Sequence, residues 1–257
     1  MQTRVKTSAE IKAIRESGII WGKVMAKVMA AVQPGVSTKA LADIAAEELK
    51  EQGGSAPFLG YAGAPGFPNF PDVICISLND EVVHGIPSKD RIIQDGDVVS
   101  LDFGVKWKGM ITDGARTVIA GRPKTQGHIR LVQDTEAALQ AGIAVLKDRV
   151  RAGDIGAAVE GALSHRQYGI VKDLVGHGVG HELHEDPNIP NYGRSGTGPW
   201  LSAGMTIAIE PMVNLGTERV IVAPDGWTIL TADGSRSAHF EDTVLITNDG
   251  AEVITKL

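Results

Sequence analysis

The sequence predicts an α+β fold in which one domain, residues 1–257, contains two similar halves at about 1–122 and 123–257. The first observation is an order of patterns that occurs twice: two helical stretches, then several short β-branched runs. The second is a pair of similar stretches in matching order, VQPG with VRAG and GDVVSLD with GMTIAIE. Repeated units in one order indicate a duplication, so equivalent residues of the two halves are expected beside a common axis.

The first half is expected to begin with two helices. Thr7-Ser8-Ala9-Glu10 has the form of a capping box, and the apolar stripe that follows stops at Pro34-Gly35. A second helix is expected to end at about Gly53. Residues 54–72 are rich in glycine, proline and aromatic side chains, which indicates a loop with exposed aromatic groups of the kind that lines binding sites. The β-branched runs VICISL, DVVSLDFGV and MITDGARTVIAG then predict strands.

The second half repeats this order. Helices are expected at about 124–150 and 154–168, and a histidine-rich segment follows them. The runs MTIAIEPMV, RVIVAP, WTILTA and SAHFEDTVLIT then predict strands, separated by the turn sequences PDG and ADG.

The composition is that of a globular protein, with 43% hydrophobic and 22% charged residues. No uncharged apolar run is long enough to span a bilayer, and the first residues, MQTRVKTSAEIK, lack the apolar core of a signal peptide. The net charge of -6 argues against a phosphate-binding surface. A single cysteine, Cys75, excludes an internal disulfide and is typical of a reducing compartment. A cytoplasmic protein with no specific nucleic-acid or membrane partner is therefore expected.

Three histidines, His177, His181 and His184, lie within the stretch GHGVGHELHEDPNIP. Their spacing does not fit the helical zinc motif H-E-x-x-H, and Gly178 and Gly180 disfavour a helix between the first two. An extended or looped segment is expected. Because alternate residues of an extended chain share a face, His177 and His181 would point one way and His184 the other, and the three need not share one metal.

Four carboxylates are distributed evenly over the two halves. Asp102 and Glu210 each end an apolar run, six residues after a glycine, while Asp113 and Glu241 lie on later strands of their halves. Buried carboxylates are unfavourable without a cation. With neutral His177 they would balance two divalent metal ions, and such oxygen-rich ligation suits Mn(II), Fe(II) or Co(II).

The same four acids also admit an ion-pair interpretation. Arg116 and Arg236 lie close to them in the sequence and could neutralise them, or the acids could cap turns. Ion-pair networks resemble functional sites in composition, so the residues alone leave both interpretations open.

The ordered motifs NDEVVHGIP, LDFGVKWKGMITDGART, GHGVGHELHEDPNIPNY, IEPM and SAHFEDTVLIT closely resemble those of the type I methionine aminopeptidases, over nearly the whole chain. The resemblance implies the pita-bread (creatinase/aminopeptidase) fold, with two pseudo-symmetric halves, an antiparallel sheet and flanking helices. It also implies an enzyme that removes the initiator methionine from the N-terminus of nascent proteins and peptides, by hydroxide attack at a dinuclear metal centre.

The resemblance further implies which residues hold the two divalent ions, expected to be Fe(II), Mn(II) or Co(II). Asp113 and Glu241 would bridge both ions. The full ligand set that matches the family comprises Asp102, Asp113, His177, Glu210 and Glu241.

Catalytic and substrate-binding roles follow from the same match. His184 would contact the substrate carbonyl, His84 the scissile amide nitrogen, and Glu210 would shuttle a proton. His181 is assigned no chemistry. His239 could support Glu241 from the same face of a strand, or it could be a surface or structural histidine. The methionine pocket would be lined by Phe58, Tyr61, Phe70, Cys75, Leu183 and Trp227.

Two features of the predicted pocket depart from the pattern of the family. The loop at 62–69 is longer than in many relatives, and Leu183 stands where phenylalanine is common. Cys75 is expected to be a small buried residue of the pocket, because no cysteine–histidine pair at a suitable spacing indicates a nucleophile.

Other functions remain open alternatives. Xaa-Pro aminopeptidases and prolidases share the fold and the ligands but usually carry an additional N-terminal domain, for which this chain has no room. Non-catalytic relatives typically lose ligands, and type II methionine aminopeptidases carry a large insertion in the second half. A monomer is expected, and contact with the ribosome surface is left open.

Overall fold

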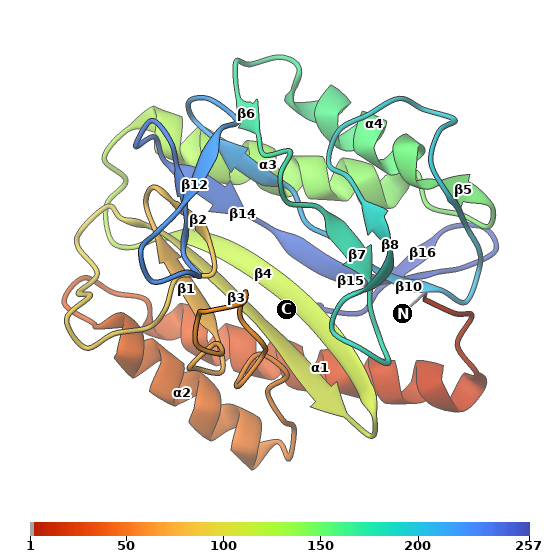
Figure 1. The fold of residues 1–257 in the computed structure, drawn as a ribbon, viewed down its shortest axis with the longest axis horizontal. Helices are drawn as coiled ribbons and strands as arrows, with labels where there is room; N and C mark the ends of the chain where they lie inside the picture. Colours follow the sequence, from red (N-terminus) through yellow and green to blue (C-terminus); the bar gives the residue numbers. More distant parts are fainter. Residues whose placement is uncertain (1–2) are drawn as a thin grey trace.

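A curved antiparallel sheet forms the centre of the computed structural model, which describes residues 3–257 (Figure 1). Its strands run in the order β1-β3-β4-β15-β10-β7-β8, with β16 also paired to β15. The first three strands come from the first half of the chain and the others from the second. The strand bounds are β1 (Cys75–Leu78), β2 (Glu81–Val83), β3 (Val98–Trp107), β4 (Met110–Ile119), β5 (Val150–Arg151), β6 (Gly169–Ile170), β7 (Gly176–Gly178), β8 (Glu185–Ile189), β9 (Trp200–Leu201), β10 (Thr206–Ile209), β11 (Met212–Asn214), β12 (Val220–Val222), β13 (Ile229–Thr231), β14 (Ser237–His239), β15 (Glu241–Ile246) and β16 (Ala251–Val253).

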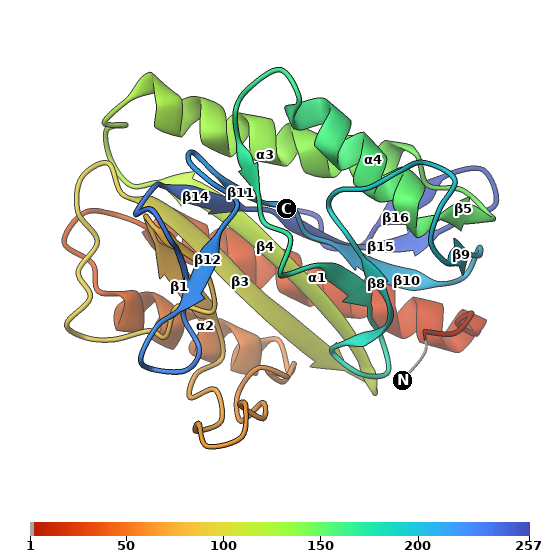
Figure 2. The same cartoon turned by 45° about the horizontal axis from the view of Figure 1, so that its top comes forward.

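Two pairs of helices accompany the sheet, one pair for each half (Figures 1 and 2). The first pair packs against β3 and β4 and shares one hydrophobic core with β1 and β3, and the second pair shares another core with β10 and β15. This is the predicted α+β arrangement of two similar halves. The helices are α1 (Ser8–Ala31), α2 (Thr38–Glu51), α3 (Gln126–Ala144) and α4 (Ala152–Leu163).

The start of α1 has the predicted capping box. The Thr7 hydroxyl accepts a hydrogen bond from the Glu10 backbone N–H, and the Glu10 carboxylate accepts one from the Thr7 backbone N–H at 2.7 Å. Further along α1, the Trp21 indole stacks on Phe103 of β3 with ring centroids 5.6 Å apart, and its N–H donates to the Phe103 carbonyl. This helix is therefore fixed beneath the strands that carry Asp102 and Asp113.

The helices of the second half differ from the predicted ranges. Where one helix was expected to reach residue 150, α3 ends at Ala144, because Arg149 adopts a left-handed φ of 59° and the two residues after it pair with β9. The next helix, α4, ends at Leu163, five residues before its expected end. Among residues 3–257, no helix is both long enough and apolar enough to cross a membrane.

Candidate metal centre and binding pocket

Strand register places the candidate ligands on one face of the central sheet. Asp102 is paired with Ala115, and Asp113 lies two residues from Ala115 on β4 and therefore on the same face. Glu241 is also paired with Ala115, across the junction between the two halves. Three carboxylates from three neighbouring strands thus converge where the halves meet.

The second half contributes the other two ligands to that face. His177 on β7 pairs with Ala208, which pairs with Thr243, two residues from Glu241. Glu210 follows β10 directly, two residues beyond Ala208. The alternation of side chains along strands therefore explains why residues far apart in sequence meet at one site.

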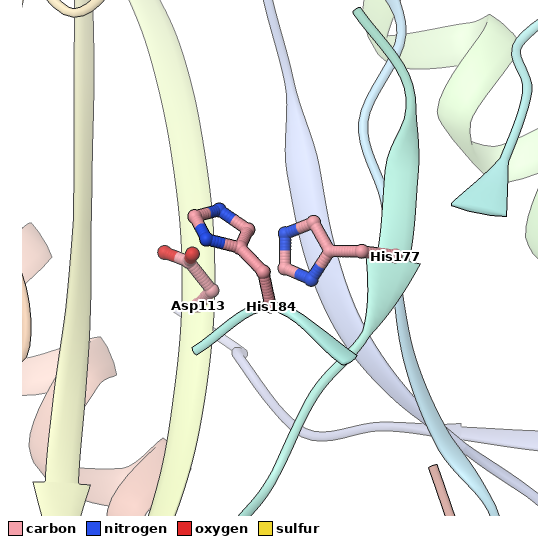
Figure 3. A group of neighbouring side chains, drawn as sticks. All are labelled: Asp113, His177 and His184. Carbon is pink, nitrogen blue, oxygen red and sulfur yellow. The ribbon is translucent and has the colours of Figure 1, made fainter. Parts of the chain in front are cut away.

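The ligand atoms are close enough to share metal ions. Mutual separations of no more than 4.8 Å define three overlapping groups, and Asp113, His177 and Glu241 each belong to two of them. Figure 3 shows one group, in which the imidazole of His184 lies beside Asp113 and His177. The groups are Asp102 with Asp113 and Glu241, His177 with Glu210 and Glu241, and Asp113 with His177 and His184.

Burial makes this acidic cluster unfavourable without a cation. Desolvation raises the pKa of Asp113 to about 7, although a hydrogen bond from the Gly114 N–H opposes the shift. Desolvation also raises the pKa values of Asp102, Glu210 and Glu241, and the neighbouring negative charges raise them further. Four acids with raised pKa values at one place are typical of a functional site.

The ion-pair interpretation of these acids is wrong for the part of the chain that the structure describes. The Arg116 guanidinium pairs with Asp242 at 2.7 Å and reaches only the backbone carbonyl of Glu241. No ion pair joins any of the four acids to Arg236 within residues 3–257, and one oxygen each of Asp102 and Glu241 is buried without a hydrogen-bond partner there. Oxygen ligands with one imidazole fit a hard or borderline divalent metal ion, which would satisfy these unpartnered atoms.

His177 is prepared to act as a neutral ligand. Its Nδ1 lies 2.8 Å from the carbonyl oxygen of Gly178, so a proton on Nδ1 donates to that carbonyl and the Nε2 lone pair stays free. Nε2 lies 3.5 Å from Glu210. Desolvation, followed by the neighbouring His184, lowers the pKa of His177 to about 3.

The predicted orientation of the three histidines is wrong. The rings of His177 and His184 pack edge to face with centroids 4.4 Å apart, rather than pointing to opposite sides. The chain leaves the extended conformation after β7, where Gly180 adopts a φ of 144° that favours glycine. His181 instead faces α1, with its Nε2 2.8 Å from the Glu10 carboxylate.

A hollow with an empty volume of about 550 Å³ opens above the acidic cluster. All the residues that the sequence assigned to metal, catalysis or the methionine pocket lie on its wall, so the structure brings the whole predicted set together; their individual roles stay predictions. The lining comprises Phe58, Tyr61, Phe70, Cys75, His84, Asp102, Asp113, His177, Leu183, His184, Glu210, Trp227 and Glu241.

The aromatic wall of this hollow is only partly as expected. Phe58 and Phe70 are buried and meet edge to face at 6.4 Å, and Phe70 packs against Trp227 at 5.3 Å. The expectation of an exposed aromatic loop is wrong for these two residues but holds for Tyr61 and Phe67, which remain exposed. The wall is therefore a small core cluster that opens onto the acidic floor.

The loop at 62–69 contacts the wall of the hollow at Trp227. The Pro68 carbonyl accepts a hydrogen bond of 2.8 Å from the Trp227 indole N–H, and the Phe67 ring lies against Gly226. A Cβ on Gly226 would clash with that ring. This loop thus holds the Trp227 indole in place at the wall of the pocket.

Two further pocket residues have informative local environments. Burial and the nearby acids raise the pKa of the Cys75 thiol, which agrees with a neutral wall residue rather than a nucleophile. His84 adopts a left-handed φ of 61°, uncommon for a residue with a side chain. Desolvation lowers its pKa to about 4, so its imidazole is neutral at physiological pH.

His239 is a buried neighbour of the site, for which the sequence allowed either support of Glu241 or a surface or structural role. Its Nε2 lies 3.5 Å from the carboxylate of another candidate ligand, Glu210. Its ring is buried, and neither ring nitrogen has a hydrogen-bond partner among the described residues. Between β14 and β15, at Phe240, the chain passes from one sheet to another, so the alternation of side chains along a single strand could not reveal the contact between His239 and Glu210.

Comparisons with known proteins agree with this geometry. Residues 12–248 match the model of metallopeptidase family M24. A methionine aminopeptidase of Mycoplasma capricolum is 41% identical over 98% of both chains. The crystal structure of a methionine aminopeptidase from Thermotoga maritima is similar with a TM-score of 0.95 at 40% identity, over 100% of both chains.

The prolidases are more distant. A prolidase from Pyrococcus furiosus has a TM-score of 0.76 at 25% identity, and the match covers 98% of this chain but 65% of the prolidase. The chain therefore belongs to metallopeptidase family M24 and, within it, to the methionine aminopeptidases.

Proposed function

We propose that this protein removes the N-terminal methionine from nascent proteins and peptides in the cytoplasm, as one catalytic domain with pseudo-repeats at about 1–122 and 123–257. The observation that carries the proposal is the placement of four buried carboxylates and a neutral imidazole on the floor of an aromatic hollow. An acidic floor that requires cations and an apolar wall sized for one side chain fit an exopeptidase that binds the first residue of a peptide. The protein is expected to act as a monomer, and contact with the ribosome surface is left open.

Two divalent metal ions, Mn(II), Fe(II) or Co(II), would be held by Asp102, Asp113, His177, Glu210 and Glu241. When bound, such ions supply Lewis acidity and lower the pKa of water at the site. The Nδ1 contact of His177 with the Gly178 carbonyl orients its free Nε2 towards this cluster.

Glu210 would carry the proton that the reaction must move from water to the departing amine. Its carboxylate lies between two imidazoles, with one oxygen 3.5 Å from His177 and the other 3.5 Å from His239. Desolvation, followed by the neighbouring Asp113 carboxylate, raises the pKa of Glu210 above its ordinary value, which favours acceptance of a proton by this carboxylate.

Two histidines would act on the peptide bond itself. His184 would donate a hydrogen bond to the carbonyl oxygen of the first residue, where negative charge develops. His84, held by its left-handed backbone and packed edge-on to Trp227 at 6.2 Å, would contact the amide nitrogen that leaves.

The wall of the hollow would select methionine. Phe58, Phe70 and Trp227 present ring edges and faces to it, and thioether sulfur makes favourable contacts with aromatic rings. Burying an unbranched apolar side chain there contributes about 1.5–3 kcal/mol to binding. The bound Trp227 indole and the loop at 62–69 limit how large that side chain can be.

Release of free methionine from Met-Ala-Ser tests this function. The metal-reconstituted protein should release methionine, a chelator should abolish the release, and an Xaa-Pro peptide should stay intact. Cleavage of the Xaa-Pro peptide alone would show that the protein has the prolidase-type activity instead. No cleavage with Mn(II), Fe(II) or Co(II) would contradict a catalytic function.

A further inference from the structure

We infer that the Tyr61 hydroxyl positions His184 and fixes its tautomer, beyond the role of Tyr61 as a wall of the methionine pocket. The Tyr61 Oη lies 2.6 Å from His184 Nδ1, and the two rings meet edge to face with centroids 5.2 Å apart. On its other side the His184 ring packs against His177. The inference rests on the proposed function, because it concerns the residue assigned to the substrate carbonyl.

The backbone around Tyr61 is fixed, although the ring is partly exposed. Its N–H donates to the Phe58 carbonyl at 3.0 Å, and its carbonyl accepts from the Phe70 N–H at 2.9 Å. These hydrogen bonds close the base of the loop at 62–69. The Tyr61 side chain therefore extends from a backbone position that is fixed on both sides. The hydroxyl therefore reaches His184 from an anchored position.

The direction of this hydrogen bond decides where the His184 proton lies. A neutral imidazole carries one proton, on either Nδ1 or Nε2. Burial raises the pKa of the Tyr61 phenol above its ordinary value, so the hydroxyl keeps its proton at neutral pH and can donate it. When Tyr61 donates to Nδ1, the His184 proton lies on Nε2, the nitrogen that does not face Tyr61.

This tautomer matches the chemistry assigned to His184. A hydrogen-bond donor is needed where a carbonyl oxygen gains negative charge, and Nε2–H supplies one. The reverse arrangement would put the proton on Nδ1, donating to the Tyr61 oxygen, and would leave on Nε2 a lone pair that accepts hydrogen bonds or binds metal. That reverse arrangement suits a metal-binding imidazole, since Asp113, His177 and His184 lie within ligand distance of one another.

Tyr61 and His184 also separate two hollows. Both residues, with Leu183, line the methionine pocket and a second hollow of about 610 Å³ that is bordered by Lys106 and Glu182. The hydrogen bond thus forms part of the partition between them. Its loss would give the imidazole room to rotate towards the second hollow.

The experiment compares the wild-type protein with Tyr61→Phe, which removes one oxygen and keeps the aromatic ring. Nitrogen-15 NMR of the metal-free, histidine-labelled protein at about pH 8 reports which ring nitrogen carries the proton. His184→Asn assigns the resonances. Tyr168→Phe is the control, because Tyr168 donates a similar hydrogen bond of 2.6 Å to Asp134 and lies outside the residues that line the methionine pocket.

The wild type and Tyr168→Phe should show His184 protonated on Nε2, whereas Tyr61→Phe should show a mixture of both tautomers. In the loaded enzyme Tyr61→Phe should lower kcat about fivefold, the equivalent of one ordinary hydrogen bond, with KM for Met-Ala-Ser nearly unchanged. A wild-type proton on Nδ1, or one tautomer unaltered by Tyr61→Phe, would overturn the inference. If the wild type released no methionine, that result would contradict the proposed function, but the NMR result would still show which tautomer of His184 is present.

Discussion

Lys6 and Glu185 form an ion pair of 3.4 Å in which both side chains are completely buried. Glu185 immediately follows His184, and its carboxylate also accepts hydrogen bonds from the backbone N–H groups of His181 and Glu182. The N-terminal segment thereby holds the turn from which His184 reaches the site.

Lys6→Met should therefore be strongly destabilising. It leaves the Glu185 carboxylate buried without a cation, which typically costs about 3–5 kcal/mol of unfolding free energy. Urea unfolding of the metal-free protein measures the loss. Lys108→Met is the control, because Lys108 pairs with Glu16 at the surface and should change stability by less than about 1 kcal/mol. Equal losses in the two variants would show that burial of the pair does not matter.

Glu10 should make stability depend on acid pH. Hydrogen bonds, first from the Thr7 N–H and then from His181, lower the pKa of Glu10 from 4.5 to about 2. A depressed pKa in the folded state means that the stabilisation is complete above the ordinary value and is lost as the pH falls towards 2. The wild type should therefore have a higher Tm than Glu10→Gln near pH 6, and this difference should disappear as the pH falls to about 2. A difference that stays constant over this range would contradict the assignment.

Gly114→Ala should disturb the candidate metal centre from the side of the sheet that packs against Trp21. A Cβ at Gly114 would come within 2.7 Å of the Trp21 indole, and the next residue back is Asp113. Overpacking of this kind costs about 1–3 kcal/mol, and displacement of Asp113 should weaken metal binding measured by calorimetry. Gly161→Ala in α4 is the control: its Cβ would meet nothing within 4 Å, and it should stabilise the protein by up to about 1 kcal/mol. Unchanged metal affinity in Gly114→Ala would show that the strand yields without moving Asp113.

Asp102→Asn should have opposite effects with and without metal. It removes one of the neighbouring buried acids, so the metal-free protein should gain stability at pH 8, where mutual repulsion of the acids is greatest. Added Mn(II) should raise the Tm of the wild type far more than that of the variant, because ligand binding stabilises the folded state. The surface variant Asp43→Asn should respond to metal as the wild type does. A variant less stable than the wild type in chelator would contradict the repulsion argument.

The sequence was sufficient to predict those parts of the site that follow from the alternation of side chains along a strand. Asp102, Asp113 and Glu241 share a face because side chains alternate along strands, and the letters around them resemble a known family. The duplicated order of helices and strands likewise predicted two halves with a common junction.

Features that depend on long-range contacts could not be predicted. The meeting of His177 and His184 depends on the turn at Gly180, and the burial of Phe70 depends on Trp227 more than a hundred residues later. The early end of α3 similarly reflects pairing of β5 with β9, which local helix propensity does not include.

Anomalous diffraction from crystals of the Mn(II)-loaded protein would examine the candidate centre most directly. Two peaks about 3.5–4 Å apart, both within bonding distance of Asp113 and Glu241, are expected. Asp102 should bind one ion, His177 the other, and His184 neither. A single peak, or a peak bonded to His184, would contradict the dinuclear centre proposed for these five ligands.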